Sequence, residues 1–89
     1  MSRNEDKDRY EAHIEGKLAG FAEYQLTHEL VVFTHTEVYE QFEGLGVGSV
    51  LARFALDDVR ARGERKVLPL CPFINGWIAR HQDYADLVM

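Results

Sequence analysis

Apolar and polar residues alternate near the start of the chain, as they do in a strand with one solvent-facing side. Residues 9–15 alternate in this way, with Tyr10, Ala12 and Ile14 as the apolar set. A turn signal at residues 15–17 predicts that the next strand, residues 18–26, returns antiparallel as a hairpin. A second turn at residues 27–29 leads into a third strand over residues 30–38. The pattern therefore predicts an antiparallel three-stranded meander.

The spacing of the apolar residues then changes to i, i+3 and i+4, which is typical of one face of a helix. The apolar residues in question are Val47, Val50, Leu51, Phe54, Ala55 and Val59. We expect this helix to run from about Leu45 to Arg62 and to end at Gly63. Arg60 and Arg62 complement the dipole at its C-terminal end.

A short apolar run at residues 67–71 predicts a last strand, parallel to its partner because a helical crossover precedes it. Pro72 suits the first turn of a second helix, whose apolar residues we interpret as core packing. These residues are Phe73, Ile74, Trp77 and Ile78. The predicted order is βββαβα, an α/β protein of the α+β kind with a mixed sheet.

The connection between the third strand and the first helix is rich in glycine. It reads Gln41-Phe42-Glu43-Gly44-Leu45-Gly46-Val47-Gly48-Ser49, with glycine at three alternate positions. A glycine turn that opens a helix presents unpaired N–H groups and the positive end of the helix dipole, which suits a phosphate. The spacing departs from the dinucleotide fingerprint, and a P-loop would need a Lys where Gly48 stands. The alternative is a turn whose glycines only permit a tight connection.

Gln41, Gly44 and Gly46 match the Q/R-x-x-G-x-G/A motif of the GCN5-related N-acetyltransferases. Three further stretches occur in the expected order around this motif: residues 35–38, 67–73 and 80–88. From about residue 9 to residue 88 the chain resembles a subgroup of short proteins in that superfamily, marked by a Cys and a Gly near the C-terminus. Cys71 matches the cysteine. The resemblance implies a minimal acetyltransferase-like fold.

The resemblance also implies a cofactor, acetyl-CoA or CoA, with its pyrophosphate on the glycine loop. In this superfamily the strands on either side of the loop's helix splay apart, and the pantetheine arm lies in the gap. The general rule that ligands bind beyond the carboxyl ends of parallel strands indicates the same place. The implied cofactor-binding residues are Thr36, Val38, Gln41, Gly44, Leu45, Gly46, Val47, Gly48, Ser49 and Cys71.

Acetyl transfer to an amine requires a base that takes the ammonium proton. His35 and Glu37 lie two apart on a strand and face the same side, so either could be that base. Cys71 stands where a helix N-terminus favours a thiolate, and we expect it to be partly exposed in the gap. It is a candidate nucleophile, a channel-lining residue or a small buried apolar residue. Tyr84 resembles the tyrosine that serves many superfamily members as general acid.

Composition indicates one soluble domain, residues 9–89, after a charged flexible tail at residues 1–8. The net charge of −5 argues against nucleic acid as a partner and is compatible with a basic acceptor. No apolar run approaches the roughly 20 residues that span a bilayer. A single cysteine permits no internal disulfide and fits the cytoplasm. The four histidines show no metal-ligand spacing, so we expect no metal site.

The chain lacks a segment that longer members of the superfamily use to form the acceptor pocket. They place helices after their first strand, whereas here only residues 15–17 separate the first two strands. Either the acceptor is large and supplies its own shape, or a second subunit closes the site, or no transfer occurs. The acceptor is an amine of unknown identity, a small molecule or a protein tail. Two hypotheses follow: an acetyl-CoA-dependent N-acetyltransferase, and a CoA-binding or protein-interaction module with little or no catalysis.

Overall fold

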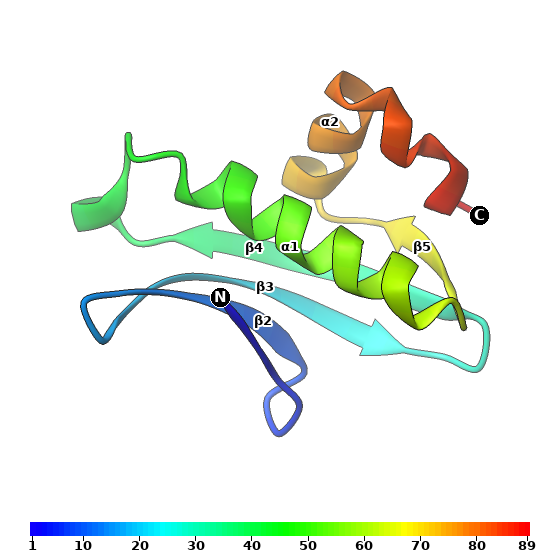
Figure 1. Ribbon diagram of the computed structural model, residues 1–89, viewed down its shortest axis with the longest axis horizontal. Helices are drawn as coiled ribbons and strands as arrows, with labels where there is room; N and C mark the ends of the chain where they lie inside the picture. The colour runs from blue at the N-terminus through cyan, green and yellow to red at the C-terminus, as the bar shows by residue number, and fades with distance from the viewer.

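The computed structural model describes all residues, 1–89, and contains one five-stranded sheet in the order β1-β2-β3-β4-β5 (Figure 1). The strands are β1 (Ser2–Asn4), β2 (Arg9–Ile14), β3 (Lys17–Leu26), β4 (Leu30–Val38) and β5 (Lys66–Pro69). The helices are η1 (Glu40–Phe42), α1 (Val47–Arg62), α2 (Pro72–Arg80) and η2 (Gln82–Leu87). Strands β1 to β4 pair antiparallel and β5 pairs parallel with β4, which confirms the predicted mixed sheet.

The N-terminal segment, which its charge predicts to be a flexible tail, is paired with the sheet over its first residues. Ser2–Asn4 form the edge strand β1, paired antiparallel with β2. Its side chains make specific polar contacts: Arg3 Nε donates to Tyr24 Oη at 2.9 Å, and Asn4 Nδ2 donates to Glu11 Oε2 at 3.0 Å. The short strand has no apolar alternation, so only its cross-strand partners reveal it.

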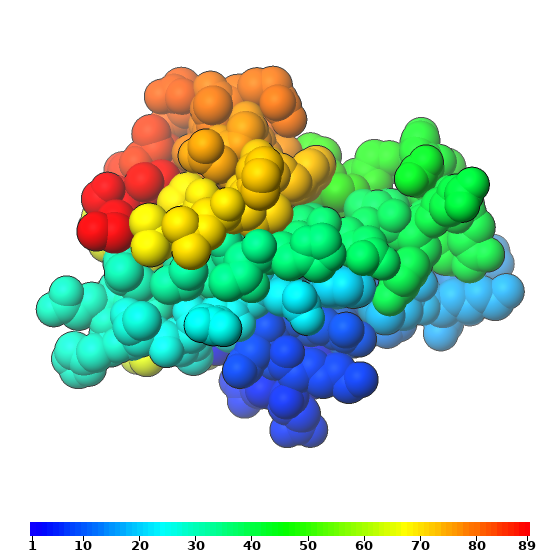
Figure 2. Space-filling view, turned by 180° about the vertical axis from the view of Figure 1, so that it is seen from behind, coloured from blue at the N-terminus to red at the C-terminus, as the bar shows by residue number.

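One face of the sheet carries both main helices. Helix α1 packs across β2, β3 and β4, and α2 lies beside it over β4 and β5. Figure 2, seen from behind, shows β2, β3 and β4 with no helix over them; we call this side the helix-free face. The buried core lies between the sheet and the helices. Its largest fully buried side chains are Trp77, Tyr10, Phe33, Leu51, Leu56, Ile74 and Val67.

Helix α1 follows the predicted periodicity with one exception. Val47, Leu51, Ala55 and Val59 are buried, as expected, but the side chain of Val50 is 54% exposed. Leu56 and Ala52 are buried in addition. The helix ends at Gly63, whose φ of +64° and N–H bond to the Val59 carbonyl form a left-handed C-cap. None of the helices is long and apolar enough to cross a membrane.

A bulge in β4 decides which side chains face the helices. His35 pairs with Glu23 and Phe33 pairs with Tyr24, so Thr34 is an extra residue in β4. The bulge reverses the alternation, and Phe33 and Thr36 both face the helix side although they differ in parity. His35 and Glu37 therefore point to the helix-free face. The contacts of the two side chains agree with these orientations. Thr36 accepts a hydrogen bond from Cys71 beneath α2, whereas the His35 ring packs against Phe21, with the two ring centroids 6.0 Å apart.

Asp58 on α1 ties the helix to β2. Tyr10 Oη donates to Asp58 Oδ2 at 2.7 Å, and Arg62 Nε donates to the same oxygen at 2.9 Å. Burial alone would raise the pKa of Asp58, but the hydrogen bonds from Tyr10 and Arg62 outweigh it and the pKa is lowered. A lowered folded-state pKa stabilises the fold above the unfolded-state pKa, near 4, and this contribution is lost as pH falls through the folded-state value.

We therefore expect Asp58→Asn to lower the free energy of unfolding by about 1–3 kcal/mol at neutral pH. The wild type should lose stability below about pH 4, and the variant should lose less of it over the same range. Urea unfolding at several pH values measures both effects. Asp6→Asn, an exposed carboxylate without a partner, is the matched control. An unchanged pH dependence in Asp58→Asn would contradict the role assigned to Asp58.

Candidate functional site

Strands β4 and β5 separate at the position that the sequence predicts. They pair over four positions, from Leu30 with Lys66 to Phe33 with Pro69. One more backbone bond follows, from the Cys71 N–H to the Phe33 carbonyl at 2.9 Å. Beyond it β4 continues to Val38, while the other chain turns into α2. No strand pairs with this edge of β4 from Thr34 to Val38, so its N–H and C=O groups are free for a ligand.

A groove of about 350 Å³ opens beside this gap. The end of β4, the glycine loop (residues 41–49), the first turn of α1 and one side of α2 form its walls. The lining residues are Val38, Phe42, Glu43, Gly44, Gly46, Val47, Gly48, Ser49, Phe73, Trp77, Arg80 and His81. Its volume lies at the lower end of the range of small-molecule sites. Six of the predicted cofactor-binding residues lie in this lining.

The other predicted cofactor-binding residues surround the groove. Thr36 and Cys71 lie at the strand gap. Gln41 borders a neighbouring open hollow with Tyr39 and Glu40. Leu45 is 65% exposed at the surface of the loop. The structure thus gathers the predicted set around one end of the sheet, with the glycine loop at its centre.

The backbone of the glycine loop leaves donors free. Gly44 and Gly46 have φ values of +82° and +77°, in the left-handed region that favours glycine. A Cβ atom at either position would meet nothing within 4 Å, so the space in front of them is open. No side chain caps α1, and the N–H groups of Val47, Gly48 and Ser49 donate to no backbone oxygen. This is the arrangement that binds anions at helix N-termini.

Helix α2 supplies an aromatic wall to the groove, although its apolar periodicity predicts core packing. The Phe73 side chain is 38% exposed and covers Gly48, where a Cβ atom would lie 2.7 Å from Phe73 Cζ. Trp77 is buried, and its Nε1 donates to Ser49 Oγ at 2.8 Å. Phe73, Trp77 and His81 are spaced four residues apart, and this periodicity does not distinguish a core face from a site wall.

His35 and Glu37 lie together on the helix-free face. Their side chains are 55% and 46% exposed, and His35 Nε2 lies 3.4 Å from Glu37 Oε1. They share β4 with Thr36, which points to the opposite side of the sheet. The gap between β4 and β5 therefore separates the groove, on the helix side, from this pair.

Cys71 is buried, and the expected partial exposure is wrong. Its side chain is only 2% exposed, and its thiol donates to Thr36 Oγ1 at 3.3 Å. The residue is the N-cap of α2, and its carbonyl accepts the N–H of Asn75, which holds the side chain under the helix. A thiol that is covered and donates a hydrogen bond is poorly placed to attack.

Tyr84 lies apart from His35, Glu37 and Cys71. Its hydroxyl donates to Asp57 Oδ1 at 2.6 Å and accepts from Arg53 Nη1 at 3.1 Å, both on α1. The hydrogen bond to Asp57, together with burial, raises the pKa of Tyr84. The ring packs against Trp77 with centroids 5.1 Å apart. These contacts attach η2 to α1.

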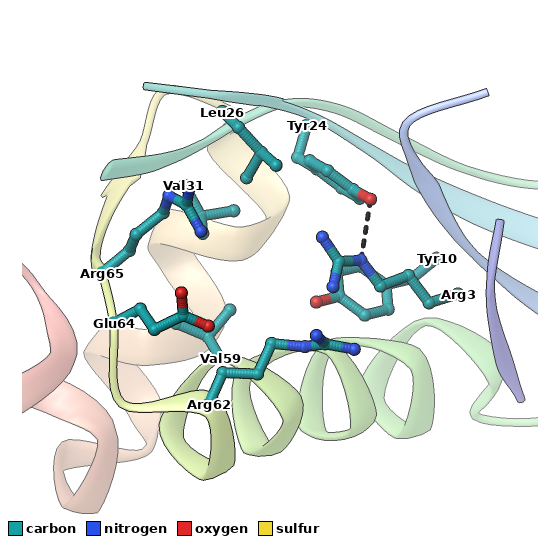
Figure 3. A pocket seen from close by; sticks show the side chains of 9 residues that line it. All are labelled: Arg3, Tyr10, Tyr24, Leu26, Val31, Val59, Arg62, Glu64 and Arg65. Carbon is teal, nitrogen blue, oxygen red and sulfur yellow. Dashed lines mark hydrogen bonds between the residues drawn. The ribbon is translucent and has the colours of Figure 1, made fainter. Parts of the chain in front are cut away.

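A second hollow lies at the other end of α1, between Arg3, Tyr10, Tyr24 and Val59 (Figure 3). It measures about 10 Å³, enough for about one water molecule. Arg3 Nε bonds the Tyr24 hydroxyl, as the dashed line in Figure 3 shows, and the Arg62 guanidinium bonds Asp58. Its size excludes a cofactor. The groove beside the glycine loop is the candidate site.

Several groove residues were not predicted from the sequence: Phe42, Glu43, Phe73, Trp77, Arg80 and His81. Phe42 and Glu43 fall inside the glycine motif, at positions that the motif leaves unspecified. The other four lie on α2 or directly after it, and they reach the groove only because α2 packs beside the first turn of α1.

Comparison with known families agrees with this geometry. Residues 9–87 of the chain match the family model described as GCN5-related N-acetyl-transferase. The chain belongs to this family of acetyltransferases, and its meander, crossover helix and parallel strand form a minimal version of the family's fold. Among curated proteins none matches the chain significantly.

Proposed function

We propose that this protein is an acetyl-CoA-dependent N-acetyltransferase that acts on an amine. The observation that carries the proposal is the groove itself. It combines uncapped N–H groups at the start of α1 with open space in front of Gly44 and Gly46. These features fit the pyrophosphate of the cofactor on residues 41–49. Bound acetyl-CoA supplies an acetyl group activated as a thioester.

The free edge of β4 offers a binding site for the pantetheine arm. The amides of the arm need hydrogen-bond partners, and the N–H and C=O groups of β4 between Thr34 and Val38 have none on the side of the gap. Val38 lines the groove, whereas Thr36 and Cys71 line the gap. In this arrangement Cys71 shapes the channel and forms no bond to the acetyl group.

The acceptor amine then approaches from the helix-free face. An ammonium must lose a proton before nitrogen can attack the thioester carbonyl. His35 and Glu37 stand exposed beside the gap on that face, 3.4 Å apart. One of the two takes the proton, and the other orients that base by a hydrogen bond. As the C–N bond forms, the C–S bond of the thioester would break, and CoA would leave as a thiolate that takes up a proton.

The alternative function, a CoA-binding or protein-interaction module with little catalysis, rests on a different observation. No helix covers the helix-free face (Figure 2), and β2 and β3 are joined by only two residues, Glu15 and Gly16. No wall therefore encloses an acceptor near His35. Thiol release from acetyl-CoA with a panel of amines, measured beside CoA binding, separates the two functions. Binding without thiol release would favour the alternative.

The cofactor assignment is tested by substitution in the glycine loop. We expect the wild type to bind CoA and Gly46→Val to bind it at least about 10-fold more weakly. A β-branched residue is strained at a φ of +77°, so the loop should change conformation and its N–H groups should no longer point toward the ligand. Isothermal titration calorimetry measures the affinities.

Gly63→Val is the matched control. It places the same side chain at a φ of +64° at the opposite end of α1, with nothing closer to a Cβ atom than the Arg60 carbonyl at 4.0 Å. It should cost comparable stability and leave CoA affinity unchanged. Equal CoA affinity of folded Gly46→Val and wild type would contradict the assignment of the loop.

A further inference from the structure

Arg80 differs from the other arginines in having no partner. Its guanidinium makes neither a hydrogen bond nor an ion pair within the protein. The remaining six are all hydrogen-bonded: Arg3, Arg9, Arg53, Arg60, Arg62 and Arg65. In a chain with a net charge of −5, carboxylates are in excess. Arg80 is exposed, so water hydrates its guanidinium and its N–H donors are free to bind an anion.

Arg80 stands beside the candidate site. It is the last residue of α2 and lines the same groove as the glycine loop. The helix dipole favours a cation at this end of α2, but by only a few tenths of a kcal/mol to about 1 kcal/mol at an exposed site. The dipole explains an arginine at the helix end and does not explain why it borders the groove.

The neighbouring His81 is held by two contacts. Its ring stacks on Trp77, with centroids 3.8 Å apart and an interplanar angle of 12°. Its Nδ1 lies 2.7 Å from the Trp77 carbonyl, so Nδ1 carries the proton of that bond and Nε2 is left without a partner. Glu43 is the only acidic residue in the lining. Arg80 is therefore the one permanent positive charge of the groove.

We propose that Arg80 binds a phosphate group of the cofactor, so that the C-terminal end of α2 forms part of the CoA site. The inference rests on the proposed function and extends it to a residue outside the glycine motif. A guanidinium presents a planar pair of N–H donors that matches two phosphate oxygens. CoA carries phosphate at two places, the pyrophosphate and the ribose 3′-phosphate. Dephospho-CoA lacks only the second.

Calorimetric titration of CoA and dephospho-CoA into wild type, Arg80→Ala and Arg80→Lys tests the proposal. We expect Arg80→Ala to weaken CoA binding about 10- to 100-fold, the usual effect of losing a charge-assisted hydrogen bond. Arg80→Lys should retain part of the affinity, because it keeps the charge without the planar pair of donors. If Arg80→Ala binds CoA more weakly but dephospho-CoA as the wild type does, the contact is to the 3′-phosphate. If Arg80→Ala loses the same factor of affinity for both ligands, the contact is to the pyrophosphate.

Lys7→Ala is the control for net charge. Lys7 lies in the turn between β1 and β2, exposed and without a side-chain partner, so the variant loses one positive charge away from the groove. It should bind both ligands as the wild type does. If Arg80→Ala also binds CoA as the wild type does, this inference is overturned and the proposed function stands. If the wild type does not bind CoA, both are overturned.

Discussion

His35→Ala and Glu37→Gln are each expected to lower the turnover of amine acetylation by about 10²–10⁴-fold, the usual contribution of a general base. CoA affinity should stay unchanged, because both side chains lie on the helix-free face and the groove lies on the other side of the sheet. Steady-state kinetics on an accepted amine, with calorimetric titration of CoA, measures the two effects separately. Turnover equal to that of the wild type in both variants would remove the pair from the mechanism.

Glu29→Gln is the matched control for charge. Glu29 lies in the turn before β4, is exposed and has no side-chain partner, so its neutralisation should leave turnover unchanged. A comparable loss of activity in this variant would show that the net charge of the protein, rather than a base at His35 or Glu37, determines the rate.

Cys71→Ala should behave differently from His35→Ala and Glu37→Gln. A covalent mechanism needs a sulfur that can reach the acetyl group, and the Cys71 thiol is covered and donates to Thr36. Direct transfer from thioester to amine requires no such sulfur. The variant is therefore expected to keep CoA binding and measurable activity. An acetylated Cys71 isolated from the wild type by mass spectrometry would overturn direct transfer.

The largest effect on stability is expected from Gly20→Ala. A Cβ atom at Gly20 would lie 2.6 Å from the Glu37 carbonyl oxygen and 3.2 Å from Val38 Cα. Both are backbone atoms of the neighbouring strand, so no side chain can turn aside to relieve the overlap. We expect the free energy of unfolding to fall by about 2–4 kcal/mol in urea denaturation. CoA affinity should fall as well, because β4 would shift at the edge of the gap.

Gly76→Ala provides the contrast within the same protein. Gly76 lies inside α2, where the nearest atom to a Cβ would be Arg80 Nη1 at 3.5 Å, the end of a flexible side chain. Alanine in a helix interior is favoured over glycine by roughly 0.5–1 kcal/mol, so this variant should gain stability. If Gly20→Ala were as stable as the wild type, the close contact between β3 and β4 would not constrain the fold.

The sequence by itself determined most of the architecture. Period-two alternation identified β2, and the turn signals at residues 15–17 and 27–29 identified β3 and β4. The i, i+3, i+4 spacing identified α1, and a crossover helix before β5 required a parallel last pair. The glycine motif at Gln41, Gly44 and Gly46 indicated the family that the comparison confirms. These features are local: they depend on residues within a few positions of one another, so they can be recognised without knowing the partners in space.

Only the tertiary structure decided how the side chains are distributed around the gap. Simple alternation would place His35 and Glu37 on the same side as buried Phe33, but the bulge at Thr34 turns them to the helix-free face. A bulge is a property of the pairing with β3 and has no signature in β4 alone. The burial of Cys71 likewise depends on contacts between segments distant in the chain.

The same holds for α2 and for the N-terminus. The spacing of Phe73 and Trp77 predicts an apolar stripe, but the packing of α2 beside α1 decides that Phe73 lines the groove and that Arg80 stands there unpaired. β1 forms although its sequence is polar, because Asn4 and Arg3 find partners on β2 and β3. Periodicity reports which residues prefer burial, whereas the partner of each side chain depends on the packing of the whole fold.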